Sequence, residues 1–202
     1  MNKPTIIYLN KLGLTFKSQK IMAKKLDKIL VVDVESTCWQ GAPPEGQVNE
    51  IIEIGICVFD LKERQRSSRE SILVKPTQSE ISPFCTQLTT ITPDLIEAEG
   101  VDLKEACRIL RKKYESQQRV WGSWGDYDRR QFERNCKNRG IGYPFGTNHL
   151  NIKTLFAIQN RLEREIGMDG ALELMQWELE GTHHRGVDDA WNIARLMSTL
   201  IG

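Results

Sequence analysis

The feature that most constrains the fold is a stretch of aliphatic residues between Ile29 and Thr37 that also carries two carboxylates, Asp33 and Glu35. Such a run predicts a buried central strand. Residues i and i+2 of a strand point to the same face, so the two acids would lie together beside an apolar core. Two close carboxylates need a cation between them or a raised pKa on one of them. The alternative is that both acids lie at the frayed end of the strand and are solvated.

Composition places the chain among globular proteins of one domain. Its 202 residues, 40% hydrophobic and 27% charged, are enough for a substantial core. No apolar run approaches the roughly 18 residues that cross a bilayer, so we expect no membrane contact. Five cysteines, an odd number without a CxxC pair, favour reduced thiols in the cytoplasm. A net charge of +1 gives no global sign of nucleic-acid binding, so the local distribution of charge carries more information.

The beginning of the chain differs from the rest. Residues 1–27 are rich in lysine, contain a single acid and have one short apolar patch at residues 6–9. The patch is too short for an anchor and no cleavage site follows it, so we do not assign a signal peptide. We expect residues 1–27 to be a basic extension and residues 28–202 to form one domain. A lysine-rich arm can bind phosphates, although most such arms are solvated tails.

Two further strands are predicted after the first. Residues 51–59 form a strongly apolar run, and residues 71–75 form a shorter one that ends before Pro76. Strands that follow one another with turn-rich connections predict an antiparallel meander. Glu53 lies near the start of the second strand, where it could support the site of the first two acids. The pattern favours the other interpretation, a solvated edge residue.

Helices are predicted in the middle and in the second half of the chain. Thr92 is a good N-cap with Pro93 at the first helical position, so a short helix should begin there. Residues 102–115 show apolar side chains at helical spacing with basic residues on the opposite side. Residues 147–166 and 169–180 also have helix-like apolar spacing.

A third candidate carboxylate follows a short strand that begins at Val120. The strand ends in glycine and gives way to a helix at residues 129–139. Asp126 can cap that helix, and Asp128 in its first turn can point back across the strand end toward the first two acids. The helix is the densest basic segment outside the extension, which fits a site for a polyanion and a metal ion. Taken alone, the stretch is equally compatible with two aspartates that only begin a helix.

A fourth candidate carboxylate lies five residues after a histidine. His184 lies on a loop and Asp189 opens the last helix, so an imidazole would lie next to a rigidly held carboxylate. That arrangement predicts a general base beside a metal ligand. Zinc bound by His183 and His184 is the competing idea. We disfavour it because adjacent side chains diverge and no cysteine or third histidine is near in the sequence.

In this order and spacing, Asp33-x-Glu35, Asp128 and His184-x4-Asp189 resemble the DEDDh, or DnaQ-like, 3′–5′ exonucleases. The resemblance runs from about residue 29 to residue 201. Further residues are similar to the branch that contains the histone-mRNA 3′-end exonucleases and the Eri-type and KapD-type proteins, which argues against a polymerase proofreader. These are residues 33–38, Pro43-Pro44, 50–54, Phe84-Cys85, Leu88-Thr89, Ile91-Thr92, 186–189 and 192–194.

The resemblance implies an α/β chain with an RNase H-like fold, in which a five-stranded mixed sheet has helices on both faces. It also implies two Mg²⁺ or Mn²⁺ ions, about 4 Å apart, bound by the four acids. Asp33 would contact both ions, Glu35 and Asp189 the ion on the side of the nucleophile, and Asp128 the second ion. His184 would remove the proton from the attacking water, which an imidazole can do near neutral pH.

The resemblance also implies a substrate and its binding residues. Leu88, Thr89 and the region of Trp39 should form the pocket for the terminal base, with Tyr127 stacked on it; core packing is the alternative for Leu88 and Tyr127. The implied reaction shortens single-stranded 3′ ends, preferably of RNA, and releases 5′-mononucleotides. A DNA exonuclease and a non-catalytic binding module of the same fold are the alternatives. We expect no protein partner.

Overall fold

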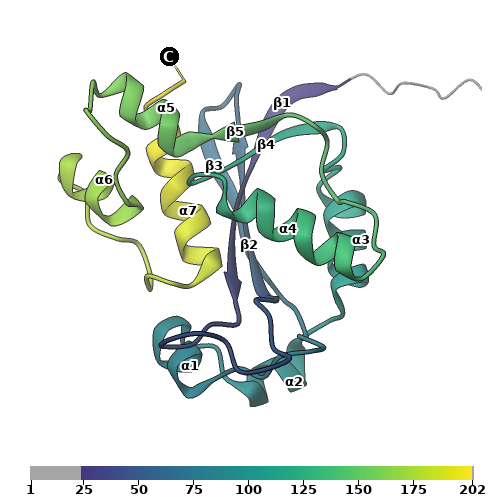
Figure 1. Ribbon diagram of the computed structural model, residues 1–202. Helices are drawn as coiled ribbons and strands as arrows, with labels where there is room; N and C mark the ends of the chain where they lie inside the picture. Colours follow the sequence, from purple (N-terminus) through teal and green to yellow (C-terminus); the bar gives the residue numbers. More distant parts are fainter. Residues whose placement is uncertain (1–23, 202) are drawn as a thin grey trace, which may run out of the picture.

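A twisted sheet runs through the centre of the molecule and has helices on both sides (Figure 1). The computed structural model describes residues 24–201. The predicted α/β class is confirmed. In chain order the elements are β1 (Lys25–Ser36), β2 (Ile51–Asp60), β3 (Gln65–Leu73), α1 (Pro83–Thr89), α2 (Pro93–Glu99), α3 (Leu103–Lys113), β4 (Arg119–Ser123), α4 (Tyr127–Asn138), β5 (His149–Asn151), α5 (Ile152–Gln159), α6 (Met168–Leu174) and α7 (Gly186–Met197).

The strand order of the sheet is β3-β2-β1-β4-β5. Neighbouring strands are antiparallel from β3 to β1, whereas β4 runs parallel to β1 and β5 runs parallel to β4. The sheet is therefore mixed and has β1 at its centre. Both the five-stranded mixed sheet and the antiparallel meander are confirmed.

The third strand is longer than predicted and begins earlier. We expected residues 71–75, but β3 spans Gln65–Leu73. Most of its side chains are exposed or half-buried because β3 is an edge strand. Its first residues are therefore polar, and an apolar run marks only its end.

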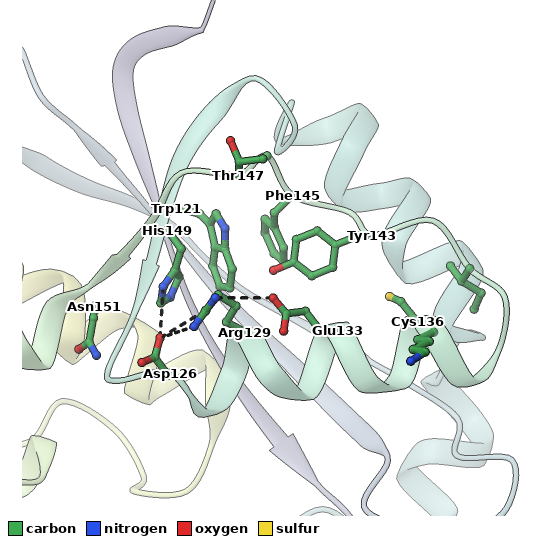
Figure 2. Close-up of a pocket in the computed structure, with 13 residues that line it drawn as sticks. Trp121, Asp126, Arg129, Glu133, Cys136, Tyr143, Phe145, Thr147, His149 and Asn151 are labelled. Carbon is green, nitrogen blue, oxygen red and sulfur yellow. Dashed lines mark hydrogen bonds and ion pairs between the residues drawn. The ribbon is translucent and has the colours of Figure 1, made fainter.

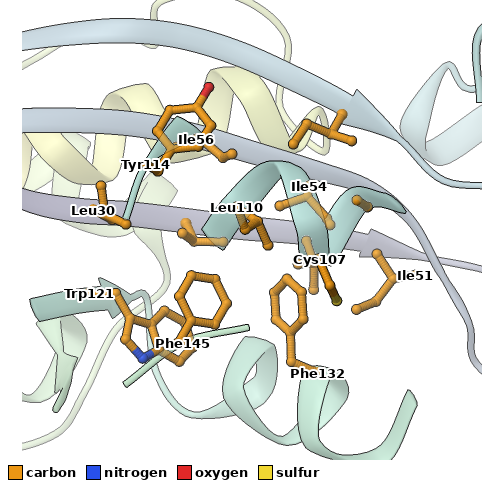
Figure 3. Packing of buried hydrophobic residues seen from close by; sticks show 14 of the residues in the cluster. Leu30, Ile51, Ile54, Ile56, Cys107, Leu110, Tyr114, Trp121, Phe132 and Phe145 are labelled. Carbon is orange, nitrogen blue, oxygen red and sulfur yellow. The ribbon is translucent and has the colours of Figure 1, made fainter. Parts of the chain in front are cut away.

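The central strand buries both of its faces, which explains its run of aliphatic residues. Leu30 and Val32 pack against α3 and α4, while Ile29 and Val31 pack against α5, α6 and α7 on the opposite face. Figure 3 shows the first of these clusters, in which Phe132 of α4 reaches the sheet. Each fully buried aliphatic side chain contributes about 1.5–3 kcal/mol. The strand that carries the first two acids is therefore rigidly held.

The two helices that were predicted in the middle of the chain, from the cap at Thr92 and from the apolar spacing of residues 102–115, begin where expected. The Thr92 hydroxyl accepts a hydrogen bond from the Leu95 N–H at 3.1 Å, and Pro93 is the first residue of α2. Asp102 caps α3 in the same way, by accepting the N–H of Glu105 at 2.7 Å. A side-chain acceptor at the N-cap satisfies one of the free N–H groups of the first turn, which fixes these starts.

The two helices predicted at 147–166 and 169–180 are much shorter in the structure. The first region contains β5, which pairs with β4, and then α5, whose N-cap is Asn151. The Asn151 side chain accepts the N–H of Thr154 at 3.0 Å, so the chain changes from strand to helix at that residue. In the second region only α6 forms.

The predicted boundary of the basic extension falls inside β1. The Lys25 N–H donates to the Gln118 carbonyl at 2.9 Å, so residues 25–27 belong to the sheet. Residues 1–23 of the predicted extension lie outside the described part of the chain. Within residues 24–201, none of the helices has the length and apolar character needed to cross a bilayer.

Candidate active site

Asp33 and Glu35 lie within β1 and not at a frayed end. Asp33 is paired with Gly55 of β2, and Glu35 is paired with Glu53. As residues i and i+2 they share one face of the strand. Oxygens of Asp33, Glu35 and Asp189 all lie within 4.8 Å of one another. The two strand acids therefore meet a third acid that comes from the last helix.

Asp128 joins this cluster because the end of a strand pairing leaves a free donor. The ladder between β1 and β4 ends at Val31, and beyond it the Val34 N–H donates to Asp128 Oδ1 at 2.9 Å. Asp128 lies in the first turn of α4 and is only 3% exposed. Asp126, which was predicted to cap α4, makes no capping hydrogen bond; its carboxylate accepts from Arg129 at 3.1 Å.

Asp189 and His184 are joined directly. Asp189 lies in the first turn of α7, and its Oδ2 accepts the backbone N–H of His184 at 3.0 Å. Its other oxygen, Oδ1, is buried and has no hydrogen-bond partner among residues 24–201. His184 has a left-handed backbone with φ 63°, which costs a residue other than glycine about 1 kcal/mol or more. The bond to Asp189 holds the loop in this conformation.

The rings of His183 and His184 are stacked face to face. Their centroids are 4.0 Å apart and their planes are inclined by only 9°. The expectation that the two side chains diverge is wrong. Consecutive side chains diverge in an extended chain, but the left-handed conformation of His184 turns the backbone between them.

The four acids and His184 line one pocket of about 400 Å³. It lies where the end of β1 meets the first turns of α4 and α7. Helix α6 and the segment before it close one side. Its lining residues are Asp33, Val34, Glu35, Trp124, Tyr127, Asp128, Gly167, Met168, Asp169, His183, His184, Asp189 and Ile193.

Burial raises the pKa of all four carboxyls, and repulsion by neighbouring acids adds to it for Asp33, Glu35 and Asp189. Burial is the largest cause for each. Neighbouring acids add to it for Asp33, whose pKa is well above its usual range, and for Glu35, whose pKa is about 9. Hydrogen bonds from N–H groups partly oppose it for Asp128, with a pKa of about 6, and Asp189, with a pKa of about 7. The site is electrostatically unfavourable without a cation.

The donor atoms fit a hard divalent ion. Mg²⁺ and Mn²⁺ prefer carboxylate oxygens, and the cluster of Asp33, Glu35 and Asp189 presents them at a spacing that an ion can bridge. The buried Oδ1 of Asp189 is an acceptor that no protein group satisfies. A bound cation would satisfy it and would also reduce the repulsion between the four acids.

Comparison with known proteins identifies the family of the chain. A family model described as Exonuclease, RNase_T, matches residues 30–197. The chain belongs to this exonuclease family. It is 29% identical to human 3′-5′ exoribonuclease 1 over 92% of its own length and 58% of the human protein, and 25% identical to the Drosophila melanogaster 3′-5′ exonuclease Snipper over 92% and 73%.

Solved structures place this exonuclease in the predicted branch. The nuclease domain of 3′hExo, a DEDDh family member bound to rAMP, superposes with a TM-score of 0.77 at 25% identity, covering 89% of this chain and 94% of that one. The resemblance to the DEDDh exonucleases, and to the branch with the Eri-type proteins, is thereby confirmed together with the RNase H-like fold.

Glu53 lies next to the candidate site of this exonuclease and holds the helix that carries Asp189. Its prediction as a solvated edge residue is wrong. It is fully buried and accepts two hydrogen bonds from Arg185, at 3.1 and 3.2 Å. It also accepts the hydroxyl of Ser71 at 2.6 Å and the N–H of Gly186 at 2.9 Å. Glu53 therefore fixes the start of α7, three residues before Asp189. Its partner Arg185 was not identified from the sequence.

A pair of glycines brings α7 of the exonuclease fold onto the sheet. A Cβ atom at Gly55 would lie 1.8 Å from the Gly186 carbonyl oxygen, which is a severe overlap. A Cβ at Gly186 would lie 3.0 Å from the carbonyl oxygen of Asp33. Backbone therefore packs directly on backbone where the helix carrying Asp189 meets the strand carrying Asp33.

The predicted substrate-binding residues are dispersed. Tyr127 lines the pocket of the acids and is 52% exposed. Leu88 is 36% exposed on α1, and Trp39 is half-buried in the segment after β1; neither lines that pocket. Thr89 is buried, and its hydroxyl donates to the Cys85 carbonyl at 2.8 Å. Their roles in binding stay predictions.

A second and more voluminous pocket, about 700 Å³, lies along the other face of α4 (Figure 2). Trp121 and Phe145 stack there with ring centroids 4.1 Å apart. Its acids are paired: Arg129 contacts Asp126 at 3.1 Å and Glu133 at 3.7 Å. Because these charges compensate one another, this pocket lacks the unpaired carboxylates that distinguish the candidate active site.

Proposed function

We propose that the chain is a metal-dependent 3′–5′ exonuclease that shortens single-stranded 3′ ends, preferably of RNA, and releases 5′-mononucleotides. The observation that carries the proposal is the convergence of four carboxylates and His184 on one pocket, with Asp189 Oδ1 buried and unpartnered. A module that only binds nucleic acid has no use for repelling carboxylates, because a polyanion favours basic groups.

Asp33, Glu35, Asp128 and Asp189 would hold two Mg²⁺ or Mn²⁺ ions. Such ions polarise the scissile phosphate, lower the pKa of a bound water and stabilise the charge on the departing 3′ oxygen. The chain supplies the geometry: β1 fixes two acids, and the first turns of α4 and α7 fix one each. Rigid elements are the best support for such a site.

His184 would accept the proton of the attacking water at a ring nitrogen. Burial, and then the neighbouring His183, lower the pKa of His184, so its imidazole is neutral near neutral pH. A neutral imidazole beside the acids can take a proton, which a protonated one cannot. The hydrogen bond from the backbone N–H of His184 to Asp189 holds the loop so that the His184 ring lines the pocket.

The preference for RNA 3′ ends is supported by the relatives. Human 3′-5′ exoribonuclease 1 and the human protein ERI1 exoribonuclease 2 are 29% and 27% identical to this chain. The chain spans about 58% of the former and 28% of the latter, so substrate features that lie in their other parts are not carried over. A second structural neighbour is a 3′-exonuclease that recognises a histone mRNA stem-loop, with a TM-score of 0.75 and 25% identity.

The test is a degradation assay on matched oligomers. RNA and DNA of one sequence, labelled at the 5′ end, are incubated with Mg²⁺, with Mn²⁺ or with EDTA. We expect stepwise shortening that stops in EDTA and is faster on RNA. A faster rate on DNA would support the DNA-directed alternative, and internal cuts would contradict an exonuclease.

A substitution of the base separates chemistry from binding. His184→Asn should slow hydrolysis about 100-fold or more, the usual contribution of a general base, while the metal-induced rise in melting temperature stays. Unchanged turnover would remove His184 as the base. Loss of the metal-induced stabilisation would instead assign it to metal binding.

A further inference from the structure

The stacked histidines add nitrogen ligands for a metal ion next to the carboxylate oxygens of the acid cluster. One donor atom each of His183, His184 and Asp189 lie within 4.8 Å of one another. Both rings are half-buried and line the same pocket as Asp189. Two imidazoles and one carboxylate are the donor types of three-ligand zinc sites, which keep a fourth position open.

A second observation points to an ion at this place. Asp189 is 5% exposed, and its Oδ1 has no partner, although the side chain lines the pocket together with both histidines. Zinc–nitrogen bonds of 2.0–2.1 Å in a tetrahedron separate donors by about 3.3 Å, so the three groups need to approach by at most about 1.5 Å. The two imidazoles must also turn out of their parallel stack, because the lone pairs of parallel rings cannot meet at one ion. Both histidines lie on the loop before α7, where rotation of their side chains provides this movement.

We propose that His183, His184 and Asp189 form an inhibitory site for a divalent ion of borderline softness, such as Zn²⁺. The nitrogen pair selects such an ion over Mg²⁺, which prefers oxygen donors. The bound ion takes the lone pair with which His184 would accept a proton, and it takes an oxygen of Asp189 from the carboxylate cluster. The inhibitory effect rests on the proposed nuclease function, whereas the binding does not.

The binding is tested first, without any activity. Co²⁺ replaces Zn²⁺ in such sites and absorbs visible light more strongly in four-coordinate geometry than in octahedral oxygen coordination. Titration of the metal-free protein with Co²⁺ should produce the intense bands, and Zn²⁺ should abolish them. His183→Phe, which keeps an aromatic ring for the stack, and Asp189→Asn should lose them. Bands that persist in His183→Phe, or their absence from the unsubstituted protein, would overturn the proposal.

Two further variants make the result secure. His183→Asn provides a second removal of the ligand if the phenylalanine disturbs the loop, and both variants are checked by thermal unfolding. Cys38→Ser is the matched control, because Cys38 is the one half-buried thiol of the five and lies three residues after Glu35. The intense bands should remain in Cys38→Ser. Their loss there would assign the ion to the thiol and contradict the histidine site.

The inhibition is tested in the degradation assay with excess Mg²⁺. Zn²⁺ should inhibit the unsubstituted enzyme, and the concentration for half-inhibition, relative to each variant's own rate, should rise about 10-fold or more in His183→Phe. Equal inhibition of both would mean that Zn²⁺ acts through the carboxylates alone, which overturns the inference. An enzyme without Mg²⁺-supported activity would contradict the proposed function, and the Co²⁺ spectra would still decide the site.

Discussion

Two groups of buried or half-buried carboxylates, on the sheet or next to it, have opposite environments. The first group is fully compensated by protein donors. Glu50 accepts hydrogen bonds from the N–H groups of Thr77, Gln78 and Ser79 and from Arg139. The second group is left without counter-charges in its pocket. The first group is Glu50 and Glu53; the second is Asp33, Glu35, Asp128 and Asp189.

The pKa of Glu50 and the pKa values of the second group are shifted in opposite directions. Burial raises the pKa of Glu50, but the N–H groups of Gln78 and Thr77 and the guanidinium of Arg139 outweigh it and keep the pKa below its usual range. The pKa values of the second group are all raised. Removing a buried acid that has a complete set of donors destabilises the fold, because its partners are left unpaired. A buried acid without such donors is a candidate ligand of a cation. Burial alone does not distinguish the two.

The largest effect is expected for Asp33→Asn. We expect the rate of RNA shortening to fall about 1,000-fold or more, because the site loses an ion ligand. In EDTA the melting temperature should rise, because the buried Asp33 carboxyl must either take up a proton on folding or stay charged beside the other acids, and an amide does neither. Asp94→Asn, at an exposed position of α2, is the matched control and should change neither quantity. A destabilised protein in EDTA would place Asp33 in the compensated group.

Glu50→Gln should have the opposite profile. It removes the charge that faces buried donors and Arg139, and we expect unfolding in urea to become easier by about 3 kcal/mol. The rate should change less than about 10-fold, because Glu50 does not line the pocket of the acids. Glu80→Gln, at an exposed neighbouring position, is the control. Loss of activity at unchanged stability would contradict the division into two groups.

The pH dependence of metal stabilisation tests the uncompensated group as a whole. Glu35, with a pKa of about 9, and Asp189, with a pKa of about 7, bind protons more tightly in the folded state than in the unfolded state. This contribution to stability is complete below about pH 4 and is lost as the pH rises through 7 to 9.

Mg²⁺ binds the ionised carboxylates, so it must displace the protons that Glu35 and Asp189 hold at low pH, and this displacement becomes easier as the pH rises. We therefore expect the stabilisation by Mg²⁺, measured as the difference from EDTA at the same pH, to increase by about 3 kcal/mol or more between about pH 6 and pH 8.5. Contributions from other groups that titrate equally with and without Mg²⁺ cancel in this difference. In Asp33→Asn the increase should be smaller. A constant difference would contradict the raised pKa values.

The smallest effect is expected for Arg185→Lys. Lysine keeps the charge opposite Glu53 but loses the two parallel hydrogen bonds, which we expect to cost about 1 kcal/mol of folding stability. The rate should also fall by a few-fold, because Glu53 and Arg185 fix the start of the helix that carries Asp189. Arg130→Lys, at an exposed position of α4, is the control for stability. A neutral Arg185→Lys would mean that charge alone compensates Glu53.

The sequence predicted the uncompensated acids better than the compensated ones. Asp33 and Glu35 follow from the two-residue period of a strand, and the position of Asp128 in a first turn is also local. That these acids meet Asp189 came from the resemblance, since no period relates residues so far apart. Glu53 was missed for the same reason, because its partner Arg185 is 132 residues away.

The fold was predicted where local signals agreed with tertiary packing. The central strand and the start of α2 at Pro93 are examples. Residues 147–166 were wrongly predicted as one helix because their apolar spacing does not reveal the cap at Asn151 or the pairing of β5 with β4. Helix α1 was missed although Ser82 and Pro83 are the same cap signal as Thr92 and Pro93, because the mixture of apolar and hydroxyl residues that follows shows no helical period. The Ser82 hydroxyl, which accepts the N–H of Cys85, fixes its start.

The contact between Gly55 of β2 and Gly186 of α7 restricts which substitutions the sequence can accept. Rim residues such as Tyr127 can be exchanged with only local consequences, since they project into solvent. At Gly55 a single added methyl group would collide with the Gly186 carbonyl and lift the helix away from the strand. The distance between Asp33 and Asp189, two carboxylates of the candidate site, therefore depends on a position that carries no functional group. A related sequence could keep all four acids and the histidine and still lose the proposed activity.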